Sequence, residues 1–164
     1  MLNSAYAETP AVHWPEMIEL FAAKSLNPLS GAIAGSPEQF GWLLNWQKQQ
    51  FQVALTDAQK AHYEEFLYPL IADNFMRQPG SGPAFAQLTA QFIDEIAQNA
   101  RRLPELEKLD IPFKLIWGDA DPYLTVAMVD ERRSHLKHSS LDVVAASHWL
   151  QVDEPEQVAK AMLA

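Results

Sequence analysis

Two polar segments of the sequence contain residue types that could carry out acid–base chemistry. The first, residues 118–122, holds Asp119 and Asp121, and the second, residues 147–149, holds His148. A carboxylate beside an imidazole fixes the imidazole tautomer and stabilises its protonated form, so the imidazole can act as a general base. The residue types therefore predict an acid–histidine pair, in which either aspartate could be the acid.

Short buried strands are expected directly before both segments. Residues 113–117 and 141–145 are apolar runs of strand length, and helical patterns follow at about 126–136 and from residue 153. This order predicts two parallel strands within an α/β sheet. Ligands bind beyond the carboxyl ends of such strands, so we expect the two polar segments to meet there.

The chain before Pro104 has helical periodicity almost throughout. Ser36 and Thr56 stand in capping-box patterns and predict helix starts at these two points. Two parallel strands, even with residues 1–3 as the remnant of a third, leave an unpaired sheet edge. We therefore expect the end of a larger sheet, in a chain that is marginally stable or self-associates.

Composition excludes several classes of protein. The 164 residues carry a net charge of −9 without clustered Lys and Arg, which argues against nucleic acid and anionic membranes as partners. The absence of cysteine excludes disulfides and thiolate zinc sites, and neither a metal nor another cofactor is expected. The apolar stretches are too short for a spanning helix, and the N-terminus is unlike a signal peptide, so a soluble, cytoplasmic protein is expected.

The two polar segments resemble those of a known superfamily. Gly-Asp-Ala-Asp at 118–121 is similar to the acid turn of the α/β-hydrolases, and His148, followed by Glu-Pro-Glu at 154–156, resembles their histidine turn and closing helix. The resemblance implies that Asp121, rather than Asp119, is the triad acid and His148 the base. Ser147 stands where many members have glycine. Without the resemblance, Asp121 would be interpreted as a turn or helix-capping aspartate, and His148 as an ordinary, non-catalytic histidine.

The resemblance also implies a domain organisation. Residues 1–8 would be the remnant of a core strand and its loop, 9–103 a helical cap (lid) domain, and 104–164 the C-terminal portion of the hydrolase core. The fold class would be a truncated α/β-hydrolase fold, with a mostly helical cap before a β-α-β-α unit of parallel strands. Aromatic side chains at helical spacing usually pack in a core; as cap residues, Trp42, Trp46, Tyr63 and Tyr68 would line a substrate pocket. Trp149, beside the histidine, is a further candidate for the pocket wall.

The nucleophile of that superfamily has no counterpart in the sequence. Its Gly-x-Ser-x-Gly elbow is absent, because residues 80–82 have the wrong spacing and Ser36 is explained as a helix cap. We expect the intact parent to hydrolyse a small, largely apolar ester, epoxide or halide, and this chain alone, without nucleophile and oxyanion hole, to be inactive. The alternatives are a non-catalytic helical binding or self-association module, and one half of a split hydrolase completed by an N-terminal half. His135 and His138 have a metal-like spacing but are better explained as an exposed helix end.

Overall fold

The computed structural model describes residues 1–77 and 80–164. Helices make up the first part of the chain, as the periodicity predicts. In order, they are α1 (Glu16–Ala22), η1 (Lys24–Leu26), α2 (Asn27–Ala34), α3 (Pro37–Phe51), α4 (Asp57–His62), η2 (Tyr63–Leu67), α5 (Tyr68–Met76) and α6 (Gly82–Leu106). Among the described residues, every helix is too short or too polar to cross a membrane.

The helix starts follow the capping signals in the sequence. The Ser36 hydroxyl accepts the backbone N–H of Gln39 at the start of α3, and a complete capping box joins Thr56 and Gln59 at the start of α4. Each side chain satisfies backbone N–H groups that have no partner within the helix. These contacts involve residues three positions apart, which is why the sequence alone predicts them.

Prolines change two helices in ways that the sequence pattern does not predict. The run from α4 to α5 is continuous, but Tyr63–Leu67 forms a π-helical turn just before Pro69, which lacks the N–H that an α-helical bond needs. The helix expected to end near residue 103 continues to Leu106. Pro104 lies in its last turn, where the loss of one hydrogen bond costs little.

The second part of the chain is the predicted strand–helix–strand–helix unit. It consists of β1 (Pro112–Gly118), α7 (Val126–Arg133), β2 (His138–Val144), α8 (Leu150–Asp153) and α9 (Pro155–Leu163). The strands are parallel, with Leu115 opposite Leu141. The second strand begins three residues earlier than the apolar run suggests, because β1 offers hydrogen bonds to the polar residues 138–140. The predicted β-α-β-α unit of parallel strands after a mostly helical segment is thus confirmed.

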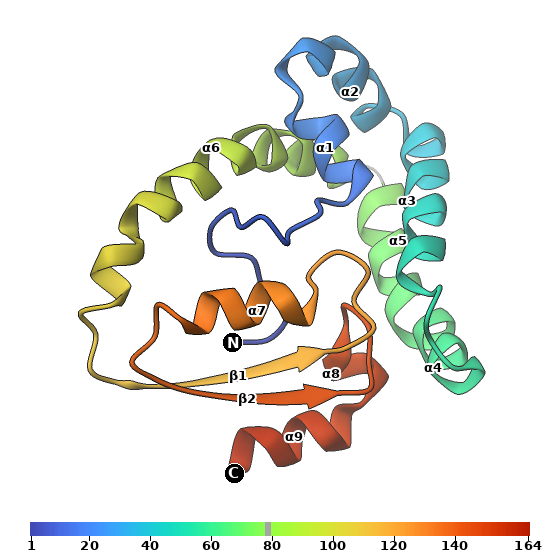
Figure 1. Ribbon diagram of the computed structural model, residues 1–164. Helices are drawn as coiled ribbons and strands as arrows, with labels where there is room; N and C mark the ends of the chain where they lie inside the picture. The colour runs from blue at the N-terminus through green and yellow to red at the C-terminus, as the bar shows by residue number, and fades with distance from the viewer. Residues whose placement is uncertain (78–79) are drawn as a thin grey trace.

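Helices cover both faces of this small sheet (Figure 1). Leu115 and Trp117 point toward α7 and pack with Met128 and Val129. Ile116, between them in the sequence, points to the opposite face, where a second cluster forms with Val144, Leu150 and Val158. This alternation is the two-residue period of a strand, and it explains why residues 115–117 are apolar on both faces of the sheet.

Residues 1–3 lie along the other edge of β1. Leu2 forms an isolated parallel bridge with Ile116, whose backbone N–H donates to the Met1 carbonyl at 2.9 Å. The N-terminal residues therefore hold the place of a third strand. Their direction brings Asn3 to the carboxyl end of the sheet, beside the turns that follow β1 and β2.

Candidate active site

The turns after the two strands are pressed against each other. The Asp119 N–H donates to the Val144 carbonyl and the Ala120 N–H to the Ala146 carbonyl, both at 3.0 Å. A Cβ on Gly118 would lie 2.4 Å from the carbonyl oxygens of both Ala146 and Ser147. Only glycine fits between these backbones without a shift, so Gly118 sets the close approach of the two turns.

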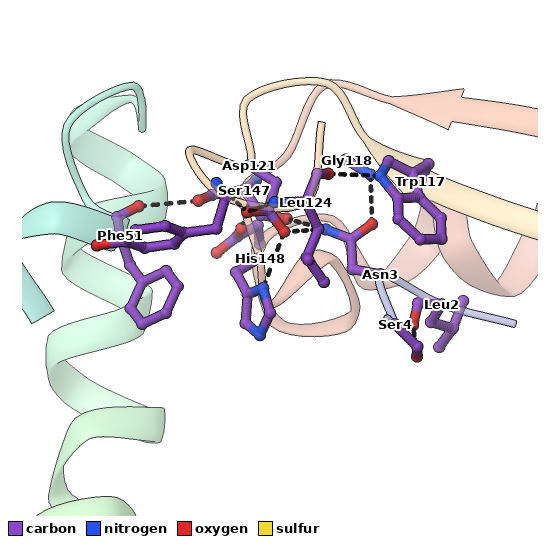
Figure 2. Close-up of polar contacts among 12 residues, drawn as sticks. Leu2, Asn3, Ser4, Phe51, Trp117, Gly118, Asp121, Leu124, Ser147 and His148 are labelled. Carbon is purple, nitrogen blue, oxygen red and sulfur yellow. Dashed lines mark hydrogen bonds and ion pairs between the residues drawn. The ribbon is translucent and has the colours of Figure 1, made fainter. Parts of the chain in front are cut away.

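Asp121 is held by this arrangement with both carboxylate oxygens engaged. Its side chain is buried, and Oδ1 accepts the backbone N–H groups of Tyr123 at 2.9 Å and Leu124 at 3.0 Å. Oδ2 lies 2.8 Å from Nδ1 of His148 (Figure 2). The competing Asp119 is exposed to solvent. The structure thus brings Asp121 and His148 together; their catalytic roles stay predictions.

The imidazole of His148 is packed between aromatic rings. Phe51 of α3 stacks on it with the ring centroids 4.9 Å apart, and Trp149 meets it edge-on at 5.2 Å. The preceding Ser147 anchors the turn, because its hydroxyl donates to the Phe51 carbonyl and its N–H donates to Asp153, both at 2.9 Å. Burial raises the pKa of Asp153 above its ordinary value, although the Ser147 N–H acts in the opposite direction.

Asn3 completes the polar network and is a site residue that sequence reasoning missed. Its Nδ2 donates to Oδ2 of Asp121 at 2.9 Å and to the Ser147 carbonyl at 3.1 Å, and its Oδ1 accepts the Gly118 N–H at 2.9 Å. Figure 2 shows the amide lying against the acid turn. The feature of the sequence that could have identified Asn3 is its position, because it is a polar residue at the carboxyl end of the strand remnant formed by residues 1–3.

Tyr123 is a second residue that was missed, and it ties the acid turn to the helices. Its hydroxyl accepts from Nε2 of Gln47 at 2.7 Å and donates to Glu16 at 2.8 Å. Burial, together with the neighbouring Glu16 carboxylate, raises the pKa of this phenol, which is therefore neutral at physiological pH. Its ring also meets Phe51 edge-on at 5.4 Å.

A cavity of about 370 Å³ opens beside His148. Its walls come from residues 3–5, from α1, α3 and α6, and from the two turns, and most of the side chains are apolar, among them Met17, Phe51, Phe85 and Phe92. A smaller cavity of about 240 Å³ shares several of these walls and extends toward η2 and α5. A larger and more open hollow of about 750 Å³ lies outside α1 and does not include His148.

The predicted pocket residues are divided between these surfaces. Trp149 lines both cavities, while Tyr63 and Tyr68 line only the smaller one. Trp42 is 68 % exposed and lies in an outer groove, and Trp46 is half-buried but lines neither cavity. The two tryptophans share a helix face, as their spacing predicts, but the face of α3 that turns toward the cavities carries Leu44, Gln47, Lys48 and Phe51 instead.

The two other paired histidines have carboxylate partners that the sequence pattern did not reveal. His135 Nδ1 lies 2.7 Å from Glu107, and His138 Nε2 lies 2.8 Å from Asp110. Within the described residues, no group of three or more His, Cys, Asp or Glu side chains is placed to hold a metal ion. These contacts join the residues after α6 to the segment after α7, through His135, and to the start of β2, through His138.

Known proteins share part of this sequence. No protein-family model matches the chain. Over 53 residues, or 32 % of its length, it is 40 % identical to 3-oxoadipate enol-lactonase 2 of Acinetobacter baylyi. Over 61 residues, or 37 % of its length, it is 36 % identical to epoxide hydrolase 1 of Caenorhabditis elegans. The matches cover only 20 % and 15 % of these relatives, so the chain spans a small part of their length.

The arrangement of helices and strands is also found in a larger solved structure. A thermophilic esterase from Thermogutta terrifontis superposes with a TM-score of 0.58, covering 99 % of this chain and 52 % of the esterase. At 15 % sequence identity this likeness concerns the fold and not the reaction. With the sequence matches to a lactonase and an epoxide hydrolase, it shows that the chain has a partial α/β-hydrolase fold and resembles the C-terminal part of that superfamily.

Proposed function

We propose that the chain supplies the acid and base of a hydrolase that cleaves a small, largely apolar ester, epoxide or halide. The observation that carries this proposal is the 2.8 Å contact between Oδ2 of Asp121 and Nδ1 of His148 beside an apolar cavity. The carboxylate holds the Nδ1 proton, which leaves Nε2 unprotonated and basic. The curated relatives, a lactonase and an epoxide hydrolase, are named for reactions in this range.

In the proposed reaction, the first step depends on the nucleophile. A serine hydroxyl gives its proton to Nε2 of His148 as its oxygen bonds to the ester carbonyl carbon, and that proton passes to the alcohol oxygen as the ester C–O bond breaks. A carboxylate nucleophile bonds directly to carbon, with no proton given up, as the epoxide C–O bond opens or the halide leaves. Either route forms a covalent ester, and a water that gives its proton to Nε2 of His148 then hydrolyses this ester, which releases the product and restores the nucleophile. The imidazolium that forms in each proton transfer is stabilised by Asp121. The cavity supplies apolar contacts to the substrate, and the helices of residues 9–103 would act as its cap.

The nucleophile and oxyanion donors are proposed to come from a complementing N-terminal half, because the sequence contains no Gly-x-Ser-x-Gly elbow. The chain alone is then expected to be inactive. With p-nitrophenyl butyrate it should show no hydrolysis beyond that of free imidazole at the same concentration. Turnover by the isolated chain that His148→Ala abolishes would refute the need for a second polypeptide segment.

The acid–base pair itself is testable in the isolated chain with phenacyl bromide. This neutral, apolar haloketone alkylates a basic imidazole nitrogen as bromide leaves, and peptide mapping by mass spectrometry compares all five histidines. We expect His148 to react at Nε2 and faster than the exposed His13, and Asp121→Asn to slow it about tenfold by removing the acceptor for the Nδ1 proton. Equal rates at all histidines, or an unchanged rate in Asp121→Asn, would overturn the proposal.

A second candidate is a non-catalytic module that associates with itself. The observation in its favour is β2, which among the described residues pairs only with β1, so its outer edge, beside the half-exposed Val143, is unpaired. Sedimentation velocity separates the two candidates. A stable dimer that shows no selective alkylation of His148 would support the module, whereas a monomer with selective alkylation supports the hydrolase.

A further inference from the structure

Apart from His148, Asn3 is the only side chain in the described part of the chain that hydrogen-bonds to the Asp121 carboxylate. It is buried, with 8 % of its surface exposed, and its three hydrogen bonds reach two separate turns: Gly118 and Asp121 in the acid turn and Ser147 in the histidine turn. Its own backbone lies beside β1, more than one hundred residues away in the sequence. One amide therefore connects the strand remnant to both turns.

Three donors besides His148 point at the Asp121 carboxylate. Oδ1 accepts two backbone N–H groups, and Oδ2 accepts Nδ2 of Asn3 and lies 2.8 Å from Nδ1 of His148. An ionised carboxylate only accepts, and it has about four acceptor positions, so these surroundings suit it. When the carboxylate accepts from His148 as well, the histidine proton lies on Nδ1.

The orientation of the Asn3 amide is settled by its neighbours. If the amide were turned over, its oxygen would face Oδ2 of Asp121 and the Ser147 carbonyl, both acceptors, while its NH₂ group would face the Gly118 N–H. The observed orientation is the one that satisfies every atom. An aspartate at this position would place a second negative charge against the first, and a serine could not span all three partners.

We propose that Asn3 is a positioning residue that fixes the Asp121 carboxylate and, through it, the Nδ1-protonated tautomer of His148. The inference rests on the proposed function, in which Nε2 of His148 must be free to accept a proton. Asn3 contributes in two ways. Its donation to Oδ2 holds this oxygen toward the imidazole, and its bonds to Gly118 and Ser147 keep the two turns at the distance that the pair requires.

The test measures the ring ¹⁵N chemical shifts of His148, which report the tautomer directly, together with its alkylation rate by phenacyl bromide. In Asn3→Ala we expect the Nε2-protonated form to appear and alkylation at Nε2 to slow about tenfold. Asn3→Asp has nearly the same shape but presents an oxygen where the donor was, so it should have the same effect even if Asn3→Ala folds poorly.

Gln59→Ala is the matched control. Gln59 is also 8 % exposed, and its amide donates to the Ala145 carbonyl and to Glu154, near the histidine turn but without contact to the pair. The Gln59→Ala protein should be less stable than the wild type and should keep the same His148 tautomer. If both Asn3 variants keep the wild-type tautomer and rate, the inference is wrong. If the wild type itself lacks the Nδ1 tautomer, the proposed function fails first, and the two failures are distinguishable.

Discussion

Replacing Gly118 with alanine tests whether the close contact of the two turns builds the site. The new Cβ would lie 2.4 Å from the carbonyl oxygens of both Ala146 and Ser147, about 1 Å closer than the roughly 3.5 Å of a normal contact. Both oxygens belong to backbone and cannot rotate away as the end of a side chain could. The acid turn and the histidine turn must therefore separate.

The expected loss in the free energy of unfolding follows from this geometry. Overpacking a well-packed site costs typically about 1–3 kcal/mol, and rigid backbone on the opposing side points to the upper end, near ~3 kcal/mol. For a chain of this size, that loss corresponds to a fall in Tm of about 6–12 °C. A separation of about 1 Å would also lengthen the 2.8 Å contact between Asp121 and His148 beyond hydrogen-bonding distance.

The assay combines urea unfolding, followed by circular dichroism, with the rate at which phenacyl bromide alkylates His148. Gly31→Ala is the control, because a Cβ at Gly31, inside the exposed helix α2, would meet nothing within 4 Å. That variant should be more stable by about 0.5–1 kcal/mol, since alanine is the better helix former, and should keep the wild-type rate. A Gly118→Ala protein with wild-type stability and rate would refute the reasoning.

Three further predictions concern single side chains. Tyr123→Phe should cost about 1–3 kcal/mol in urea unfolding, because the buried amide of Gln47 loses its acceptor. Burial raises the pKa of Asp153 in the folded chain. Between the unfolded-state pKa, about 4, and this higher folded-state pKa, the folded chain binds more protons than the unfolded chain, so the free energy of unfolding falls as pH rises. Asp153→Asn should remove this pH dependence from thermal melts. Trp42→Ser should change the free energy of unfolding by less than about 0.5 kcal/mol and leave alkylation of His148 unchanged, because this ring lies outside both cavities; a tenfold slower rate would contradict its placement.

The parts of the fold that depend on neighbouring residues were predictable. The caps at Ser36 and Thr56 join residues three apart, and the buried strand at 113–117 is an apolar run whose length and flanking residues identify it. The second strand was located less accurately because its first residues are polar. They take strand conformation only because β1 is present to pair with them.

The sequence by itself determined the residue types and the order of the acid and histidine turns, since both follow directly from strands that the apolar pattern reveals. Only the tertiary structure decided which groups surround them. Asn3 reaches Asp121 because residues 1–3 lie beside β1, and Phe51 reaches His148 because one face of α3 turns toward the sheet while Trp42 faces solvent. These contacts join residues far apart in the chain, and such contacts form only when several elements pack together, which no local pattern encodes.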